Sequence, residues 1–158
     1  MDKGLKDSDL RVAVVDRTDP RTIQELIDID RQSFGDAGLD EWGLIPILRH
    51  GRIYALHYGN EIAGMAQFLK DWDEPRKAYL YGVGIKERYR GKGLGTWFLR
   101  TCFQQLRHEG LGWVELTVDP DNDSAIRVYQ EKIGFQKLEE RKNEYGEGEH
   151  RVVMELEL

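Results

Sequence analysis

The spacing of the apolar residues limits most strongly what this chain can fold into. Residues 10–14 alternate between apolar and polar side chains, which is the period of a half-buried strand. Ile23, Leu26 and Ile27 instead recur three and four residues apart, which is the period of one helix face. Because the two periods keep alternating along the chain, we expect a fold that mixes strands and helices.

Turn signals set the bounds of these elements. Asp19-Pro20 marks the start of the first helix, since Asp caps a helix and Pro suits its first turn. Residues 35–43 have the composition of a loop, and a short apolar segment follows up to His50. Gly59-Asn60-Glu61 is a hairpin turn between two strands. Further strands are predicted at 78–85 and 113–118, helices at 94–106 and 122–132, and two more strands at the C-terminal end.

The predicted order is therefore β-α-α-β-β-β-α-β-α-β-β. This order predicts an α/β fold with a central mixed sheet flanked by helices. With 158 residues the chain has the length of one domain. We expect residues 1–158 to form a single domain, with residues 1–8 as a flexible tail.

Composition argues against several classes of function. The net charge of −6 is opposite to the basic excess of a protein that binds nucleic-acid phosphates. No apolar run reaches the roughly 18 residues of a membrane span. Cys102 is the only cysteine, and the four histidines show no metal-ligand spacing. We therefore expect a cytoplasmic protein, monomeric or homodimeric, with no metal, nucleic-acid or membrane partner.

The strongest local signal lies between a predicted strand and a predicted helix. Residues 88–96 (Arg-Tyr-Arg-Gly-Lys-Gly-Leu-Gly-Thr) interleave three basic residues with three glycines. Glycines let a ligand approach the backbone, and a helix start presents unpaired N–H groups at the positive end of the helix dipole. The pattern predicts a phosphate site; the alternative is a helix-entry turn with solvated basic side chains.

Two common phosphate loops fit this segment poorly. A P-loop places a lysine directly before its Ser or Thr, whereas Gly95 precedes Thr96 here. A dinucleotide fold needs a third glycine where Thr96 stands.

The spacing resembles the pyrophosphate-binding signature of the GNAT family of N-acetyltransferases, Arg/Gln-x-x-Gly-x-Gly/Ala. The resemblance implies that acetyl-CoA is the cosubstrate. Its pyrophosphate would contact the loop formed by Arg90, Gly91, Lys92, Gly93, Leu94, Gly95 and Thr96. Its pantetheine arm would bond the backbone of the preceding strand near Val83 and Ile85, where two glycines suit a bulge or a close backbone approach.

A second cluster, Asn122-x-x-Ala125-x-x-x-Tyr129 followed by Gly134-Phe135, resembles another pattern of that family. The resemblance implies that Asn122 contacts the pantetheine arm and that Tyr129 protonates the leaving thiolate. A phenol suits this role because it stays protonated at neutral pH. The family has four residues from Tyr to Gly where this chain has five, so a helix bulge or a longer helix end is expected. By spacing alone, Tyr129 would be a core aromatic.

An amine acceptor must also lose a proton. Glu115 resembles the acidic position of ribosomal-protein N-terminal alanine acetyltransferases, although a solvent-facing strand residue is the alternative. Asp28, Asp30 and Glu41 are weaker candidates for the base, and we expect them to be solvated helix or loop charges.

The acceptor is expected to carry a primary amine: a peptide N-terminus, a lysine or a small polyamine. In the family it is chosen by the first helix-loop-helix and the last hairpin, which here carry Phe34, Trp42 and Tyr145. The sequence thus predicts an acetyl-CoA-dependent N-acetyltransferase that works by direct attack in a ternary complex. Two alternatives remain: a catalytically silent acyl-CoA-binding module, and a nucleotide-binding enzyme that uses the same loop.

Overall fold

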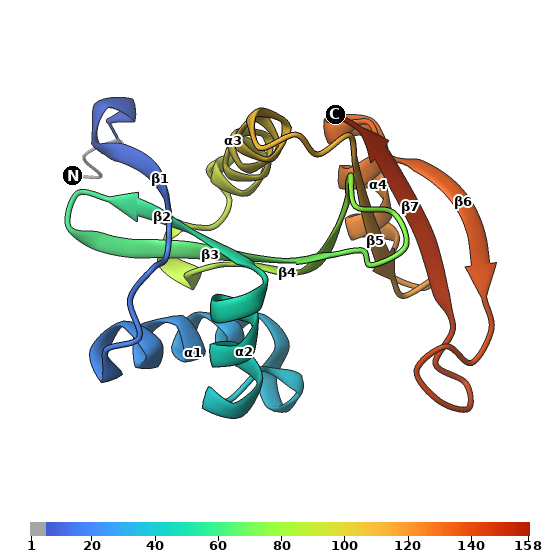
Figure 1. Ribbon diagram of the computed structural model, residues 1–158, viewed down its shortest axis with the longest axis horizontal. Coiled ribbons are helices and arrows are strands. Elements are labelled where there is room, and N and C mark those ends of the chain that lie inside the picture. Colours follow the sequence, from blue (N-terminus) through green and yellow to red (C-terminus); the bar gives the residue numbers. More distant parts are fainter. Residues whose placement is uncertain (1–5) are drawn as a thin grey trace. The chain divides into compact units, whose positions relative to one another are not determined.

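The computed structural model describes residues 6–158, so residues 1–5 of the expected tail lie outside the described part. The order of strands and α-helices is the one predicted (Figure 1). A 3-10 turn, η1 (Asp7–Asp9), precedes the first strand. The strands are β1 (Leu10–Val14), β2 (Arg52–Tyr58), β3 (Glu61–Lys70), β4 (Lys77–Ile85), β5 (Trp113–Val118), β6 (Gln136–Arg141) and β7 (Arg151–Glu157). The helices are α1 (Pro20–Phe34), α2 (Glu41–His50), α3 (Leu94–His108) and α4 (Asp123–Arg127).

The strands form one sheet in the order β1-β2-β3-β4-β5-β7-β6. β4 and β5 run parallel over Lys77–Tyr79, whereas β5 and β6 each pair antiparallel with β7. The predicted mixed sheet is therefore confirmed.

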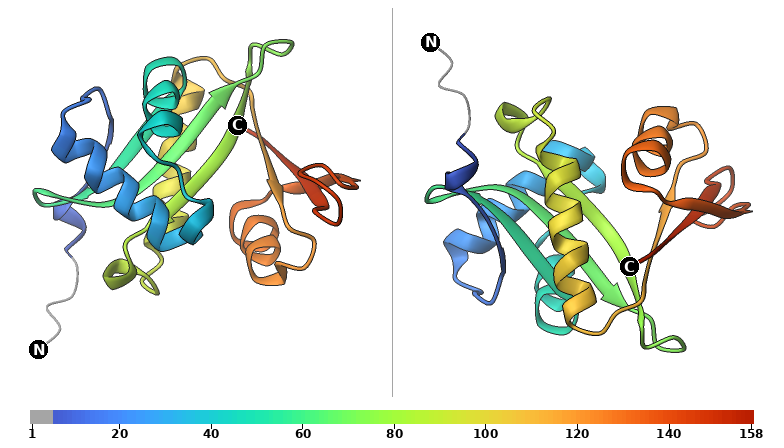
Figure 2. Two further views of the ribbon diagram at one scale, coloured as in Figure 1. Left: turned by 90° about the horizontal axis from the view of Figure 1, so that it is seen from below. Right: turned by 90° about the horizontal axis from the view of Figure 1, so that it is seen from above.

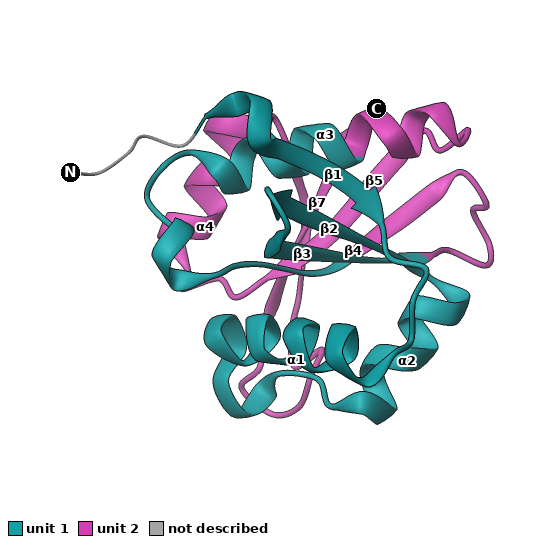
Figure 3. Ribbon diagram, turned by 90° about the vertical axis from the view of Figure 1, so that its left-hand side faces the viewer, with its two compact units in different colours: residues 1–69, 81–102 teal, residues 70–80, 103–158 magenta. Residues whose placement is uncertain are grey.

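The chain divides into two compact units, which we describe separately (Figure 3). Unit 1 contains residues up to 69 together with 81–102, and unit 2 contains residues 70–80 and 103–158. β4 and α3 each contribute residues to both units.

In unit 1 helices cover both faces of the β1–β3 layer. Figures 1 and 2 show α1 and α2 on one face and the N-terminal part of α3 on the other. The core beneath α1 and α2 is apolar, as the helical spacing predicts, and includes Leu26, Ile27, Leu44, Ile53 and Met65.

Capping residues fix where α1 and α2 begin. Asp19 accepts a hydrogen bond from the backbone N–H of Thr22 at 3.0 Å, which confirms the predicted helix start. α2 begins at Glu41, two residues before the end of the predicted loop. Asp40 caps it by accepting from the N–H of Gly43 at 3.2 Å, so a glycine typical of a loop becomes part of the first helical turn.

A buried carboxylate joins α1 to the segment that leads into α2. Asp30 is only 4% exposed, so the expectation of a solvated charge is wrong for this residue. It accepts hydrogen bonds from the backbone N–H of Leu39 at 2.6 Å and from Nε2 of Gln67 at 3.1 Å. Gln67 is itself 1% exposed. Burial raises the pKa of Asp30, although both hydrogen bonds act in the opposite direction.

In unit 2 the core lies on one face of β5. Val114, Leu116 and Val118 are buried there, while the alternate residues of this strand are half-buried. Across the described residues, no helix is long and apolar enough to cross a membrane.

The raised pKa of Asp30 predicts a stability change with a definite sign. A carboxyl whose pKa is higher in the folded than in the unfolded chain stabilises the fold while protonated, and this contribution is lost as pH rises through the folded pKa. Asp30→Asn keeps a hydrogen-bonding side chain but does not titrate. The free energy of unfolding of Asp30→Asn, minus that of the native protein, should therefore increase as pH rises from about 4 to 7.

Urea unfolding at several pH values measures this difference. Asp30→Ala serves for comparison, because it leaves two buried donors without an acceptor and should cost about 1–3 kcal/mol. A difference between Asp30→Asn and the native protein that stays constant with pH would contradict the assignment.

Candidate functional site

The glycine loop forms a helix start whose backbone is open to a ligand. Gly91 and Gly93 adopt φ angles of 73° and 76°, a left-handed conformation that favours glycine. A Cβ added to either residue would meet no atom within 4 Å. The carbonyl of Gly93 accepts the N–H of Trp97 at 3.2 Å, which is the first hydrogen bond of α3. The N–H groups of the first helical turn then have no partner within the helix.

The side chains of this loop take different positions. Leu94 is buried, so only its backbone can serve a ligand, whereas Lys92 is exposed. Gly95 lies close to β4, since a Cβ added there would lie 3.8 Å from Cγ1 of Ile85. Thr96 is half-buried in the first turn of α3.

The guanidinium of Arg90 holds the start of the loop through two hydrogen bonds. Its Nε donates to the carbonyl of Ile85 at 2.8 Å, and one terminal nitrogen donates to the carbonyl of Gln32 at 3.1 Å. The side chain of Arg90 thus holds the end of β4 and the last turn of α1, and its backbone remains part of the loop.

The two glycines of β4 permit a close approach of α1. A Cβ on Gly84 would lie 2.5 Å from Oγ of Ser33. A Cβ on Gly82 would lie 3.1 Å from Oε1 of Gln67 and 3.5 Å from the ring of Phe34. Of the two roles expected for these glycines, the structure thus shows a close approach. Val83 and Ile85 alternate with the glycines and are half-buried.

The second cluster contains a helix bulge. Asn122 caps α4, because its Oδ1 accepts from the N–H of Ala125 at 3.2 Å. A π-helical turn, η4 (Val128–Ile133), follows. The carbonyl of Tyr129 accepts the N–H groups of both Gly134 and Phe135 at 2.9 Å. The bulge therefore accommodates the additional residue between Tyr129 and Gly134, as one of the two alternatives predicted.

The ring of Tyr129 packs edge-on against Phe135, with the ring centroids 5.6 Å apart. Burial raises the pKa of the Tyr129 hydroxyl, which therefore stays protonated at neutral pH. Within residues 6–158 this hydroxyl has no hydrogen-bond partner. Tyr129 is thus a packed aromatic that retains a free proton donor.

Glu115 is paired rather than directed to solvent. Its side chain is 16% exposed and lies 3.6 Å from Nζ of Lys77. Lys77 also lies 3.5 Å from Glu155 and 3.6 Å from Glu74. Burial alone would lower the pKa of Lys77, but the three carboxylates raise it, so Lys77 stays charged.

This chain is similar in sequence and in structure to known proteins. Residues 20–135 match the model of the acetyltransferase (GNAT) family. The chain belongs to this family. It is 42% identical, over 77 residues, to a mycothiol acetyltransferase of Corynebacterium efficiens, a match that covers 49% of this chain and 25% of that protein. The chain thus spans about a quarter of the length of the curated relatives it matches.

Solved structures of acetyltransferases share the fold. The ribosomal-protein-S18-alanine N-acetyltransferase of Escherichia coli is 20% identical, with a TM-score of 0.75 and coverage of 94% of this chain and 93% of that one. A Bacillus subtilis acetyltransferase in complex with CoA is also 20% identical, with a TM-score of 0.76 and coverage of 94% and 99%. The GNAT-like fold predicted from the sequence is therefore confirmed.

Sequence reasoning missed a cluster of three hydroxyl groups in unit 2. The hydroxyl of Tyr79 lies 3.0 Å from that of Tyr145 and 3.0 Å from Oγ1 of Thr117. Thr117 and Tyr145 are 3.2 Å apart. Burial raises the pKa of Tyr79, against the effect of its bond to Thr117. Tyr145 was a predicted acceptor contact; the other two residues gave no motif signal.

The remaining candidate residues are exposed on the surface. Phe34 is 44% exposed at the end of α1, and Trp42 is 88% exposed on α2. Asp28 and Glu41 are exposed, as expected of solvated charges. Among residues 6–158, no three His, Cys, Asp or Glu side chains gather in a way that could hold a metal ion.

Proposed function

We propose that this chain is an acetyl-CoA-dependent N-acetyltransferase that transfers an acetyl group to a primary amine. The observation that carries the proposal is the helix start of α3, where two left-handed glycines leave the backbone open to a ligand. Family membership supports it, as does the CoA bound to the Bacillus subtilis protein of the same fold. We further propose that residues 1–158 act as one N-acetyltransferase domain in the cytoplasm, as a monomer or homodimer.

In this proposal the loop binds the pyrophosphate of acetyl-CoA. Backbone N–H groups donate to the phosphate oxygens, and the exposed ammonium of Lys92 adds positive charge. The backbone near Val83 and Ile85, together with the side-chain amide of Asn122, holds the pantetheine arm. Asn122 uses its Oδ1 to cap α4, so its NH₂ group is the part left for this contact.

The transfer itself needs three proton movements. Glu115 accepts a proton from the ammonium of the acceptor, and the neutral amine attacks the thioester carbonyl. The C–S bond then breaks, Tyr129 donates its hydroxyl proton to the departing thiolate, and the second proton lost by the nitrogen restores the Tyr129 hydroxyl. The raised pKa of Tyr129 keeps that proton in place until negative charge develops on sulfur.

Direct attack by the amine is favoured over an acyl-enzyme. Cys102, the only thiol in the chain, is fully buried, and burial raises its pKa. A buried thiol in apolar surroundings is inert as a nucleophile. The acetyl group therefore passes from acetyl-CoA to the amine in a ternary complex.

A screen of amines tests the activity. Acetyl-CoA is combined with N-terminal peptides, lysine peptides and polyamines, and release of free CoA thiol is recorded. Acetylation of at least one primary amine is expected. Tight CoA binding without transfer to any amine would favour the silent acyl-CoA-binding module, and binding of ATP in preference to CoA would favour the nucleotide-binding enzyme.

Substitution of Gly93 tests the pyrophosphate contact. Gly93→Val places a branched side chain in the open space over the loop. The backbone at this position is left-handed, and a valine in that conformation costs about 1–2 kcal/mol of stability. CoA affinity measured by calorimetry should fall at least about tenfold, or about 1.4 kcal/mol.

Gly110→Val is the matched control, because Gly110 also has a left-handed φ of 91° and open space around its Cβ position. It should lose similar stability while it binds CoA normally. Native CoA affinity in Gly93→Val would contradict the assignment.

Tyr129→Phe tests the general acid. The ring and its packing on Phe135 remain while the proton donor is lost, so turnover should fall by about 10² to 10⁴. Acetyl-CoA affinity should stay nearly constant. In the native enzyme the rate should fall as pH rises through the raised pKa of Tyr129, and this basic limb should be absent in the variant.

Full turnover by Tyr129→Phe, under conditions in which chemistry limits the rate, would show that Tyr129 is not the general acid and has only a structural role.

A further inference from the structure

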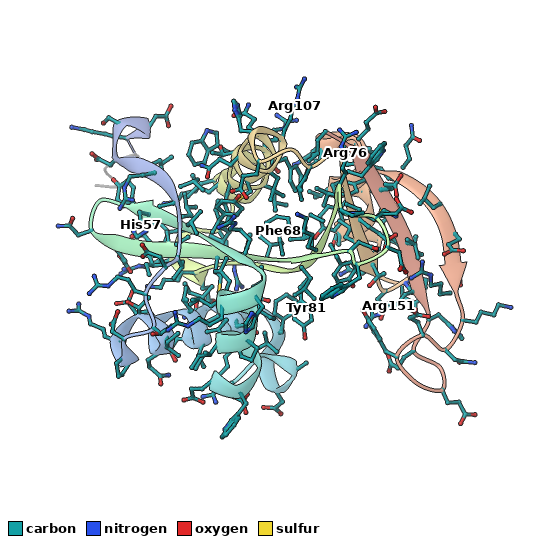
Figure 4. The ribbon with its side chains drawn as sticks, viewed as in Figure 1. His57, Phe68, Arg76, Tyr81, Arg107 and Arg151 are labelled. Carbon is teal, nitrogen blue, oxygen red and sulfur yellow. The ribbon has the colours of Figure 1, made fainter. Side chains whose placement is uncertain are left out.

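A cation in unit 2 has no ionic partner among residues 6–158. Arg151, the first residue of β7, is half-buried, and its guanidinium carbon lies 4.7 Å from the centre of the Tyr145 ring. Its Nε is buried without a hydrogen bond, and no carboxylate among residues 6–158 forms a salt bridge with it. Figure 4 shows Arg151 at the end of β7 that joins the β6–β7 hairpin loop.

Two other cations of unit 2 are paired with carboxylates. Arg141 stands directly opposite Arg151 on β6, and it pairs with Glu139 at 2.7 Å and Glu144 at 3.6 Å. Lys77 is within 3.6 Å of three carboxylates. Two arginines directly opposite each other destabilise a strand pair. Glu139 and Glu144 therefore compensate the charge of Arg141, whereas no carboxylate among residues 6–158 forms a salt bridge with Arg151.

The side chains around Arg151 hold it in a fixed place. The Tyr145 ring lies against the face of the guanidinium, and the Tyr145 hydroxyl is hydrogen-bonded to the hydroxyls of Tyr79 and Thr117. The cation–π contact uses the face of the guanidinium and leaves the N–H donors at its edge available to a ligand. A positioned guanidinium beside hydroxyl groups is a suitable receptor for a carboxylate, which it can bind through two parallel hydrogen bonds.

The strand register relates this cation to the proposed base. Glu115 faces Glu155 and Thr117 faces Val153 across the β5–β7 pair, so Arg151 lies two residues beyond Val153 on the same face. At about 3.3 Å per residue, roughly 13 Å of strand separate Arg151 from the position opposite Glu115. An extended tripeptide of about 10 Å reaches most of this distance, and the side chains at both ends shorten the gap.

We propose that Arg151, with the hydroxyls of Tyr145 and Tyr79, binds a carboxylate carried by the acceptor amine. The inference rests on the proposed N-acetyltransferase function and specifies its substrate class: short peptides, whose reacting amine and terminal carboxylate lie far enough apart to reach both places. Arg151 acts as a specificity-determining residue that holds the acceptor and takes no part in proton transfer.

The test compares two acceptors that differ only in charge. Triglycine ends in a carboxylate and triglycinamide in a neutral amide, while their reacting amines have the same surroundings. At saturating acetyl-CoA, kcat/KM should be at least about tenfold higher for triglycine, mainly through a lower KM. Arg151→Gln should abolish this preference, and Arg151→Lys should keep only part of it, because lysine lacks the planar fork.

Arg141→Gln is the matched control, since it removes the cross-strand arginine that already has carboxylate partners. It should keep the preference for triglycine. Equal use of the two acceptors by the native enzyme, or a preference that survives Arg151→Gln, would overturn the proposal.

Binding measurements separate this proposal from the proposed activity. Calorimetry with N-acetyltriglycine and N-acetyltriglycinamide needs no turnover. Tighter binding of the acid that is lost in Arg151→Gln supports the carboxylate site, even if neither amine is acetylated and the proposed transfer fails. Equal binding of the two compounds would overturn the carboxylate site, whatever the screen of amines shows.

Discussion

The close approach of α1 to β4 is the constraint on which the rest of unit 1 depends. It exists because Gly82 and Gly84 present no Cβ to the helix, and even a methyl group on Gly84 would collide with Ser33. At this distance Gln32 can fix the chain that follows β4. Its carbonyl accepts from Arg90 and its side-chain oxygen accepts from the N–H of Glu87 at 3.1 Å. The segment that leads into the glycine loop is thereby held at two points before α3 begins, so the packing of α1 helps to position the open N–H groups of the loop.

Where the sequence predicted this chain well, a local physical signal was present. The glycine loop and the cap at Asp19 depend on residues a few positions apart. The bulge at Tyr129 was indicated by a five-residue interval in place of four. Asp30 shows a signal that was available but misjudged: it follows Leu26 by four residues and Ile27 by three, and therefore lies on the buried face of α1. Its charge suggested solvent, but its position on the helix decided its burial.

The hydroxyl cluster could not have been found in the same way. Tyr79, Thr117 and Tyr145 come from three elements that are far apart in the sequence, and they meet because Tyr79 pairs with Glu115 in a parallel register. Parallel register is set by the packing of the connecting segments, and no turn between the two strands reveals it. That Arg151 has no ionic partner among residues 6–158 likewise follows only from contacts in three dimensions.

The net charge of the chain affects how Arg151 could select an anionic group. A chain with a net charge of −6 repels anionic ligands at long range, so it cannot attract them through its general field. Salt screens that repulsion over about 8–10 Å, whereas a fixed guanidinium in a partly buried site acts at contact distance and is screened much less. Selection of a carboxylate-bearing amine would therefore come from local geometry at Arg151. Because Lys77 is surrounded by Glu74, Glu115 and Glu155, the same unit keeps a local negative charge beside Lys77. An acceptor with an ammonium at one end and a carboxylate at the other matches both regions, which a simple diamine would not.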